Sequence, residues 1–298
     1  MDLFDNTNLS PNSKKLYLTN LIRLNDNQEF DNLDFLDDVK TILNKIEKLS
    51  LNTKKQYLIS IVSALKLTNK KKLFTEYTKY MNEIAKMIKD KPKEEQQKTL
   101  KNNYITWEEV NEIFNQYYNK LNEFKNKKQF NIQEYNILLK TLILSLYILL
   151  PVRRNKDYYQ AIITNKKNFD IDENFNYCDL YNKVYIYNNF KTKKIYGQQT
   201  VEIPQKLMNI LKLYVKHHPL IETKQFEVPF LVEYSGKPIN DSPTITKILN
   251  NIFDKNISSS MLRHIFITDK FKKEDDEKKQ TAKEMGHSVS QQNQYIIE

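Results

Sequence analysis

Apolar residues recur at helical spacing along most of this chain, and two stretches near its start are similar to one another. Residues 9–18 and 49–58 each place a serine and two lysines ahead of a run with helical periodicity. Ser10 and Ser50 can accept hydrogen bonds from the unpaired amides of a first helical turn, and Pro11 suits the first helical position. The repeat therefore predicts two helices that begin just after these serines.

The apolar stripe fades from Leu73 onward, and residues 89–98 form a charge run without a hydrophobic residue to anchor it. A new helix is predicted at Thr106, because Thr106 and Glu109 have the spacing at which two side chains satisfy each other's end groups. We therefore expect two domains joined by a linker. The expected bounds are 1–90 for a helical domain, 91–102 for the linker and 103–298 for the second domain.

The second domain is predicted to combine helices with a small sheet. Residues 137–152 form the longest apolar run, which polar residues interrupt and which is too short to cross a bilayer, so it predicts a buried helix. Residues 184–187 and 200–203 have the composition of strands and flank a turn at Gly197, which predicts a hairpin. The expected fold class is mostly α with a small β-sheet or hairpin.

The composition of the chain indicates the charge of a partner but not its identity. The 298 residues include 47 Lys and Arg against 37 Asp and Glu, a net charge of +10, which favours an extended anionic partner such as nucleic acid. The excess of Lys, Asn and Ile is also typical of an AT-rich genome, so the charge needs support from a site. One cysteine, Cys178, excludes an internal disulfide framework and a Cys-rich zinc site, and we expect no metal or other cofactor. The acidic, polar N-terminus is unlike a signal peptide, so the expected location is intracellular and soluble.

Each of the two repeated helix starts carries a pair of lysines. They are Lys14 and Lys15 in the first copy and Lys54 and Lys55 in the second. These lysines could contact DNA phosphates, and the duplication makes this interpretation as strong as the alternative, a solvated helix face.

Charged and nucleophilic side chains gather in the last forty residues. Ser260 stands three residues before Arg263, Gly286 precedes His287, and Tyr295 lies eight residues beyond that histidine. An arginine in a helical context, a histidine after a turn glycine and a tyrosine supply a charge clamp, a second donor and a nucleophile. This combination indicates a phosphoryl-transfer site.

Together with Arg154, these residues resemble the catalytic set of the tyrosine recombinases, also called phage-type integrases. In that family the first arginine lies three residues before an acidic residue in a helix. The rule selects Arg154, which precedes Asp157, over its neighbour Arg153.

The resemblance covers nearly the whole chain. Residues 1–90 look like the family's core-binding domain, and residues 103–298 look like its mixed α/β catalytic domain. The family's lysine sits on a β-hairpin between the two arginine motifs and is similar to Lys191, with Lys193 and Lys194 as alternatives.

The resemblance implies how a DNA strand is cut without metal or ATP. Tyr295 would attack phosphorus and form a 3′-phosphotyrosyl bond, which preserves the phosphodiester energy for rejoining. Arg154 and Arg263 would hold the phosphate with forked donors. His287 would add a donor, and Lys191 would protonate the departing 5′ oxygen. The implied function is site-specific recombination or integration for a virus or mobile element, with copies of the chain assembling on double-stranded DNA.

The chain departs from the family in two places. Ser260 stands where the family usually has a histidine, and a serine cannot carry positive charge or act as an efficient acid or base near neutral pH. Three residues follow Tyr295, whereas many relatives continue into a helix that docks on a neighbouring copy. Two alternatives stay open: a recombinase-derived protein that binds DNA without cutting it, and a type IB topoisomerase or resolvase that uses the same residues.

Overall fold

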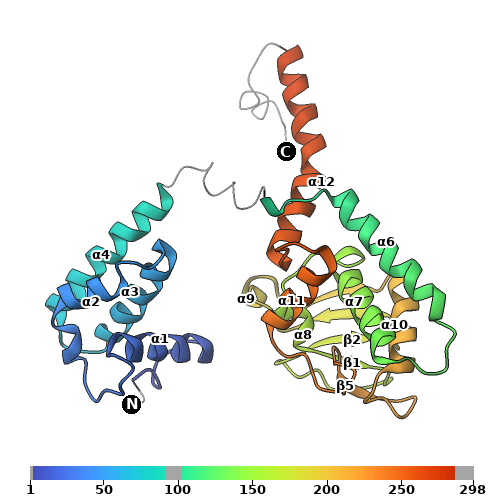
Figure 1. Ribbon diagram of the computed structural model, residues 1–298, viewed down its shortest axis with the longest axis horizontal. Coiled ribbons are helices and arrows are strands. Elements are labelled where there is room, and N and C mark those ends of the chain that lie inside the picture. The colour runs from blue at the N-terminus through green and yellow to red at the C-terminus, as the bar shows by residue number, and fades with distance from the viewer. Residues whose placement is uncertain (1–2, 91–101, 286–298) are drawn as a thin grey trace. The chain divides into compact units, whose positions relative to one another are not determined.

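The chain folds into two compact units, and a computed structural model describes residues 3–90 and 102–285 of it. The units comprise residues 1–98 and 99–298, and each is described by itself (Figure 1). The boundary between them falls inside the segment 91–102 that the sequence predicts as a linker.

Helices alone build the described part of the N-terminal unit. They are α1 (Pro11–Leu24), a short 3₁₀ helix (Asp34–Leu36), α2 (Val39–Ile46), α3 (Leu51–Leu65) and α4 (Lys71–Lys89). The two predicted helix starts are confirmed. Ser10 Oγ accepts from the amide of Ser13 at 3.2 Å, and Ser50 Oγ accepts from the amide of Thr53 at 3.3 Å.

The two repeated helices pack against one another through matching positions. Asn20 of α1 donates from Nδ2 to Oγ of Ser60 in α3 at 3.0 Å, in a buried contact. The next residue of each helix, Leu21 and Ile61, is fully buried in the same cluster of apolar side chains. In each pair the two residues are forty positions apart, which is the offset of the sequence repeat. The duplication therefore serves the core of this unit.

Helix α4 corrects the expectation that the apolar stripe is lost after Leu73. Tyr77 is fully buried and its hydroxyl donates to the carbonyl of Leu36 at 2.8 Å. Phe74 and Met81 pack against the same cluster from neighbouring turns. Two threonines, a glutamate and a lysine stand between these residues, so the stripe is hard to see in the sequence.

The C-terminal unit combines helices with one sheet. Its helices are α6 (Trp107–Phe124), α7 (Ile132–Ile148), α8 (Lys156–Tyr159), α9 (Lys193–Tyr196), α10 (Gln205–His217), α11 (Ser242–Phe253) and α12 (Ser259–Glu284). The helix predicted at Thr106 is confirmed with both halves of its cap. Glu109 donates its amide to Thr106 Oγ1 at 3.1 Å and accepts the amide of Thr106 at 2.6 Å.

The sheet has five short strands in the order β4-β3-β2-β1-β5. They are β1 (Ala161–Thr164), β2 (Asn176–Asp179), β3 (Val184–Tyr187), β4 (Gln199–Glu202) and β5 (Glu227–Pro229). β1 and β2 are parallel and the other pairs are antiparallel. The predicted hairpin is confirmed as β3 and β4, with Tyr187 opposite Gln199, and α9 lies in the connection between them. The expected mostly helical fold with a small sheet is thus present.

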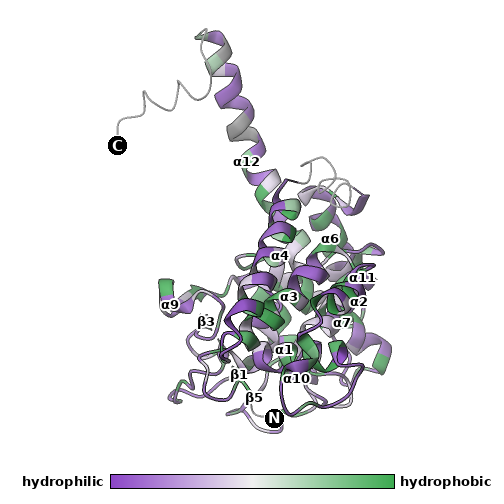
Figure 2. Cartoon of the chain, turned by 90° about the vertical axis from the view of Figure 1, so that its left-hand side faces the viewer, coloured by the Kyte–Doolittle hydropathy of each residue, from purple (hydrophilic) through white to green (hydrophobic). Residues whose placement is uncertain are grey.

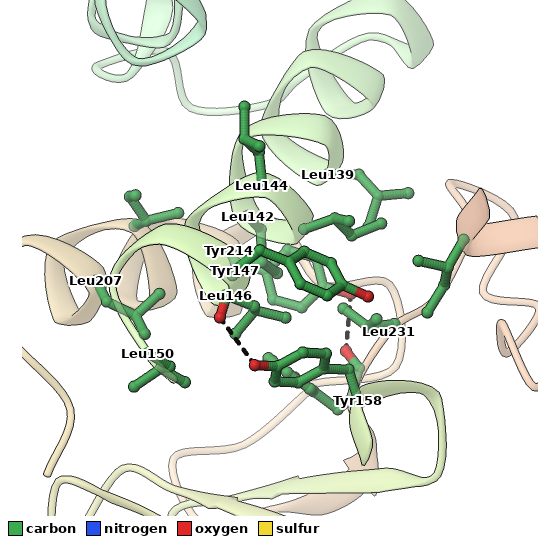
Figure 3. Close-up of a cluster of buried hydrophobic side chains, with 14 of the residues drawn as sticks. Leu139, Leu142, Leu144, Leu146, Tyr147, Leu150, Tyr158, Leu207, Tyr214 and Leu231 are labelled. Atoms are coloured by element: carbon green, nitrogen blue, oxygen red, sulfur yellow. Dashed lines mark hydrogen bonds between the residues drawn. The ribbon is translucent and has the colours of Figure 1, made fainter. Parts of the chain in front are cut away.

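Helix α7 is the central helix of this unit, and α6, α10 and α11 pack against it (Figure 1). Leu142 and Leu146 are fully buried, and Tyr158 donates its hydroxyl to the carbonyl of Leu146 at 2.9 Å (Figure 3). The expected buried helix at residues 137–152 is therefore confirmed, although it begins earlier and ends at Ile148. Over residues 3–90 and 102–285, the structure contains no helix of the length and apolarity needed to cross a membrane.

Candidate active site

Arg154 and Arg263 come from distant parts of the sequence and line the same hollow of about 300 Å³. Arg154 belongs to the connection between α7 and α8, and Arg263 to the first turns of α12. Beyond these turns α12 carries mostly hydrophilic residues (Figure 2). Arg153, Asp157, Thr192 and Tyr196 also line this hollow, which we call the arginine hollow.

The backbone beside Arg154 is fixed by a buried asparagine. Asn155 accepts from the hydroxyl of Tyr147 at 2.7 Å, which ties it to α7. Its amide donates to the carbonyl of Ser242 at 3.0 Å and to Oγ1 of Thr246 at 2.9 Å, which ties it to α11. Because Asn155 bonds to two helices at once, the position of Arg154 is set by the core of the unit.

The two guanidinium groups influence each other. Burial and, after it, the positive charge of Arg154 lower the pKa of Arg263 below its ordinary value, whereas the carboxylate of Asp157 acts in the opposite direction. An arginine remains charged at neutral pH despite such a shift. Over the described part of the chain, no hydrogen bond or ion pair engages the Arg154 guanidinium. The fold therefore holds two positive charges near one another, and the Arg154 guanidinium keeps N–H donors that no described group accepts.

Asp157 pairs with Arg153 and not with Arg154. Arg153 Nε lies 2.9 Å from Asp157 Oδ2, and the two side chains are only 15% and 3% exposed. Arg153 also donates from Nη1 to Oε1 of Gln199 at 2.7 Å. Its guanidinium carbon lies 3.9 Å from the ring centre of Tyr187 and 4.5 Å from that of Phe190. Arg153 is thus bonded through Nε and Nη1 and covered by two rings, whereas the Arg154 guanidinium, on the same hollow, is bonded to none of the described residues.

The charges around the arginine hollow suit a phosphate. Within the described segments, three guanidinium groups and one carboxylate line it, so these residues contribute two positive charges in excess. Guanidinium groups present forked donors that match phosphate oxygens, a geometry that lysine cannot copy. A phosphodiester carries one negative charge and develops more during displacement at phosphorus. The hollow can therefore hold and activate such a group.

The three candidate lysines of the hairpin lie in the connection between β3 and β4. Lys191 and Lys194 are exposed, and Lys193 is half-buried in α9. Thr192 and Tyr196, on the same short segment, line the arginine hollow. The segment thus brings lysines to the edge of the hollow, and the choice among the three stays a prediction.

Ser260 lies close to Arg263 at the start of α12. Arg263 Nη2 lies 3.4 Å from Ser260 Oγ, and its Nε donates to the carbonyl of Ser259 at 3.3 Å. Ser260 is exposed. The remaining two predicted catalytic residues, His287 and Tyr295, lie outside the described residues.

The four candidate DNA-binding lysines lie in the first turns of α1 and α3, as the repeat predicts. Lys15 is exposed and the other three, Lys14, Lys54 and Lys55, are half-buried. Lys14 donates from Nζ to the backbone carbonyl of Asp5 at 2.9 Å. This partner is neutral, so the contact does not neutralise the charge of Lys14. These lysines belong to the N-terminal unit, so they form a separate candidate surface.

Two features of the site are not among the residues selected from the sequence. Gln199 and Phe190 contact Arg153 from the two sides of the hairpin connection. The one local signal for the pairing of Arg153 with Asp157 is their spacing of four residues across the start of α8. Among the described residues no group of three or more His, Cys, Asp or Glu side chains is placed to hold a metal. Burial raises the pKa of the Cys178 thiol, which keeps it protonated and unreactive.

Comparison with protein-family models, curated proteins and solved structures finds no match to this chain.

Proposed function

We propose that this protein is a tyrosine strand transferase that breaks and rejoins DNA at specific sites, with the N-terminal unit as a core-binding domain. The observation that carries the proposal is the joint position of Arg154 and Arg263 on one hollow, which Thr192 and Tyr196 of the lysine-bearing hairpin connection also line. Like charges repel, so such a pair is best satisfied when an anion lies between them. A DNA phosphate is the anion that the net charge of the chain also favours.

In the proposed reaction the Tyr295 oxygen loses its proton to water and forms a bond to phosphorus. The bond between phosphorus and the 5′ oxygen breaks, and a hairpin lysine gives that oxygen a proton. Arg154 and Arg263 neutralise the non-bridging oxygens as charge develops, which is the largest contribution expected at such a site. An unperturbed tyrosine has a pKa of about 10, so the positive field of the two arginines assists its ionisation. The 5′ hydroxyl of another strand reverses the step to rejoin DNA.

The N-terminal unit supplies contacts to the DNA backbone in this proposal. If about six to ten phosphates are neutralised, affinity should fall by roughly three to five decades between about 50 and 200 mM salt. Replacing Lys14, Lys15, Lys54 and Lys55 by Gln should make this dependence less steep. An affinity that hardly changes with salt would contradict backbone binding.

Covalent trapping tests the proposal directly. The protein is incubated with nicked duplexes that represent candidate element ends, then denatured, and DNA-linked protein is detected by its sensitivity to protease. Wild type should give an adduct, and Tyr295→Phe should bind the same DNA without forming one. An adduct that persists in Tyr295→Phe would mean that another residue is the nucleophile.

Ser260 favours a second candidate, a recombinase-derived protein that binds DNA and does not cut it. Its hydroxyl is exposed near Arg263 and can add one hydrogen bond to a phosphate but no charge. Tight, salt-sensitive binding without an adduct on any candidate end would support this function. Relaxation of supercoiled DNA at no defined site would instead indicate a topoisomerase.

A further inference from the structure

Arg153 holds both ends of the hairpin connection that carries the candidate lysines. Its guanidinium stacks on Tyr187, the last residue of β3, and on Phe190, three residues further along. Its Nη1 donates to Gln199, the first residue of β4, at 2.7 Å. One side chain from the other side of the arginine hollow therefore closes the base of this loop.

A second set of bonds fixes the same base to the backbone of Asp157. Asn176 donates from Nδ2 to the carbonyl of Asp157 at 2.9 Å and to that of Asn189 at 3.1 Å. Its Oδ1 accepts the amides of Asn188 and Asn189, both at 2.7 Å. These bonds reach as far as Asn189, and the next residue, Phe190, is buried in the core with Arg153 over its ring. Between Phe190 and Gln199 the described structure anchors the connection only at these two ends, and Arg153 contacts both.

The tip of the hairpin has little packing of its own. On α9, Ile195 is 76% exposed and Tyr196 is 64% exposed. A four-residue helix with such exposure cannot fix its position through burial. The placement of the tip, and of the lysines on it, is therefore decided at its base.

Arg153 also neutralises the carboxylate of Asp157, which lies near the other two arginines of the hollow. Asp157 is buried, and its Oδ1 has no hydrogen-bond partner within the described residues. Arg153 pairs with this carboxylate, so Asp157 does not need Arg154 or Arg263 as its counter-ion. The Arg153–Asp157 pair thus leaves the remaining two guanidinium groups available for a phosphate.

We infer that Arg153 is a positioning residue for proton transfer: it places the hairpin lysine against the departing 5′ oxygen while Arg154 and Arg263 hold the phosphate. The inference rests on the proposed strand-transfer function. It separates two adjacent arginines by role, since Arg154 acts on the phosphate and Arg153 acts through the hairpin.

A change of leaving group tests this role. DNA with a 5′-bridging phosphorothiolate releases a thiolate, which needs no proton, so cleavage of it does not depend on a general acid. Arg153→Gln should slow cleavage of ordinary DNA by about 10²-fold, at the lower end of general-acid contributions, and cleave the sulfur substrate at a rate close to wild type. Lys191→Met, Lys193→Met and Lys194→Met are run in parallel, and the lysine that donates the proton should show the same rescue. Arg154→Gln is the matched control and should be slow on both substrates.

Hydrogen exchange without DNA supplies a readout that does not depend on cleavage. In Arg153→Gln the amides of residues 190–198 should be accelerated by a larger factor than those of α7, whose exchange reports only the loss of global stability. Gln199→Leu keeps the Arg153–Asp157 pair and should show part of the same increase, which covers the case in which Arg153→Gln folds poorly.

The outcomes separate the two proposals. A loss in Arg153→Gln that is equal on both substrates, or no loss on ordinary DNA, would overturn the positioning role, as would unchanged exchange in residues 190–198. A wild-type protein that forms no adduct on either substrate would overturn the strand-transfer function. Hydrogen exchange alone would then show whether Arg153 fixes the hairpin connection.

Discussion

Arg153 Nε lies 2.9 Å from Oδ2 of Asp157, so the one carboxylate that the described residues place on the arginine hollow is bound by the arginine that also contacts both ends of the hairpin connection. Its neighbour Arg154 makes no such pair among the described residues and contributes its charge to the hollow. Two consecutive arginines thus have different environments, and their substitution should give different results in stability and in activity.

Removing Arg153 should destabilise the C-terminal unit. Breaking a buried ion pair from one side costs about 3–5 kcal/mol, and the 15% exposure of Arg153 places this case at the lower end. Arg153→Met combined with Asp157→Asn should lose less than the two single changes added together, because the double variant has no unpaired buried charge. The measurement is urea unfolding followed by fluorescence of Trp107, the one tryptophan, which packs on Phe266 in this unit. Strict additivity of the two changes would contradict the pairing.

Removing Arg154 should leave stability almost unchanged. In the described part of the chain its guanidinium forms no hydrogen bond or ion pair, and its charge lowers the pKa of Arg263. Arg154→Gln should therefore alter the unfolding free energy by no more than about 0.5 kcal/mol, as for other substitutions outside packed or paired sites. Cleavage should fall by about 10²- to 10³-fold, the loss typical of a single donor to a developing anion. A stability loss as large as that of Arg153→Met would show that Arg154 is a structural residue.

The local elements could be predicted from the sequence because their signals lie within a few residues. Ser10, Ser50 and Thr106 cap their helices as expected, since a cap depends on a side chain and an amide three residues later. The contact between Arg153 and Gln199 could not be predicted in this way, because it depends on how a strand register places two distant residues. The nearness of Arg154 and Arg263 was expected only through the family resemblance, and no periodicity in the chain reveals it.

The packing of α1 on α3 should depend on the hydrogen bond between matching positions of the repeat. Asn20→Ala leaves the buried Ser60 hydroxyl without its donor and should destabilise the N-terminal unit by about 1–3 kcal/mol. The exchange Asn20→Ser with Ser60→Asn places the same two groups on opposite helices and should recover part of this loss. Hydrogen exchange of α1 and α3 amides in the full chain measures both. An exchange variant that is no better than Asn20→Ala would show that the two positions are not interchangeable.

Acid should destabilise the C-terminal unit through His218. Its Nδ1 accepts the amide of Leu220 at 3.2 Å, so its Nε2 carries the proton and donates to the carbonyl of Pro229 at 3.1 Å. Burial lowers the pKa of His218 to about 4, from an ordinary value near 6.5. The unfolded chain therefore binds a proton that the folded chain does not bind, and stability falls as pH drops from about 6.5 to about 4, by about 3 kcal/mol in all.

The check on His218 compares pH dependence rather than stability at one pH. The urea midpoint of unfolding, followed by Trp107 fluorescence, is measured across this pH range. In His218→Gln the midpoint should fall less steeply with decreasing pH than in wild type. His264 is exposed, so His264→Gln is the matched control and should show the wild-type pH dependence. Carboxylates contribute equally to all three proteins at the acidic end, so they cancel in the comparison. Equal slopes for His218→Gln and wild type would contradict this account.

Under the proposed function, placing a histidine at position 260 should accelerate cleavage if an imidazole there would assist the reaction. The position is exposed and lies one helical turn before Arg263, so a larger side chain fits without disturbing the core. An imidazole there can carry charge near neutral pH or exchange a proton, which serine cannot do. Ser260→His should therefore cleave at least about tenfold faster, below the full 10²–10⁴ range of acid–base catalysis because other groups already assist.

The cleavage rate of Ser260→His is measured in single-turnover reactions on the candidate DNA ends, with Ser260→Gln as a control that adds bulk and hydrogen bonding without charge. A gain in both variants would assign the effect to phosphate binding, and a gain in neither would mean that another residue already supplies this function.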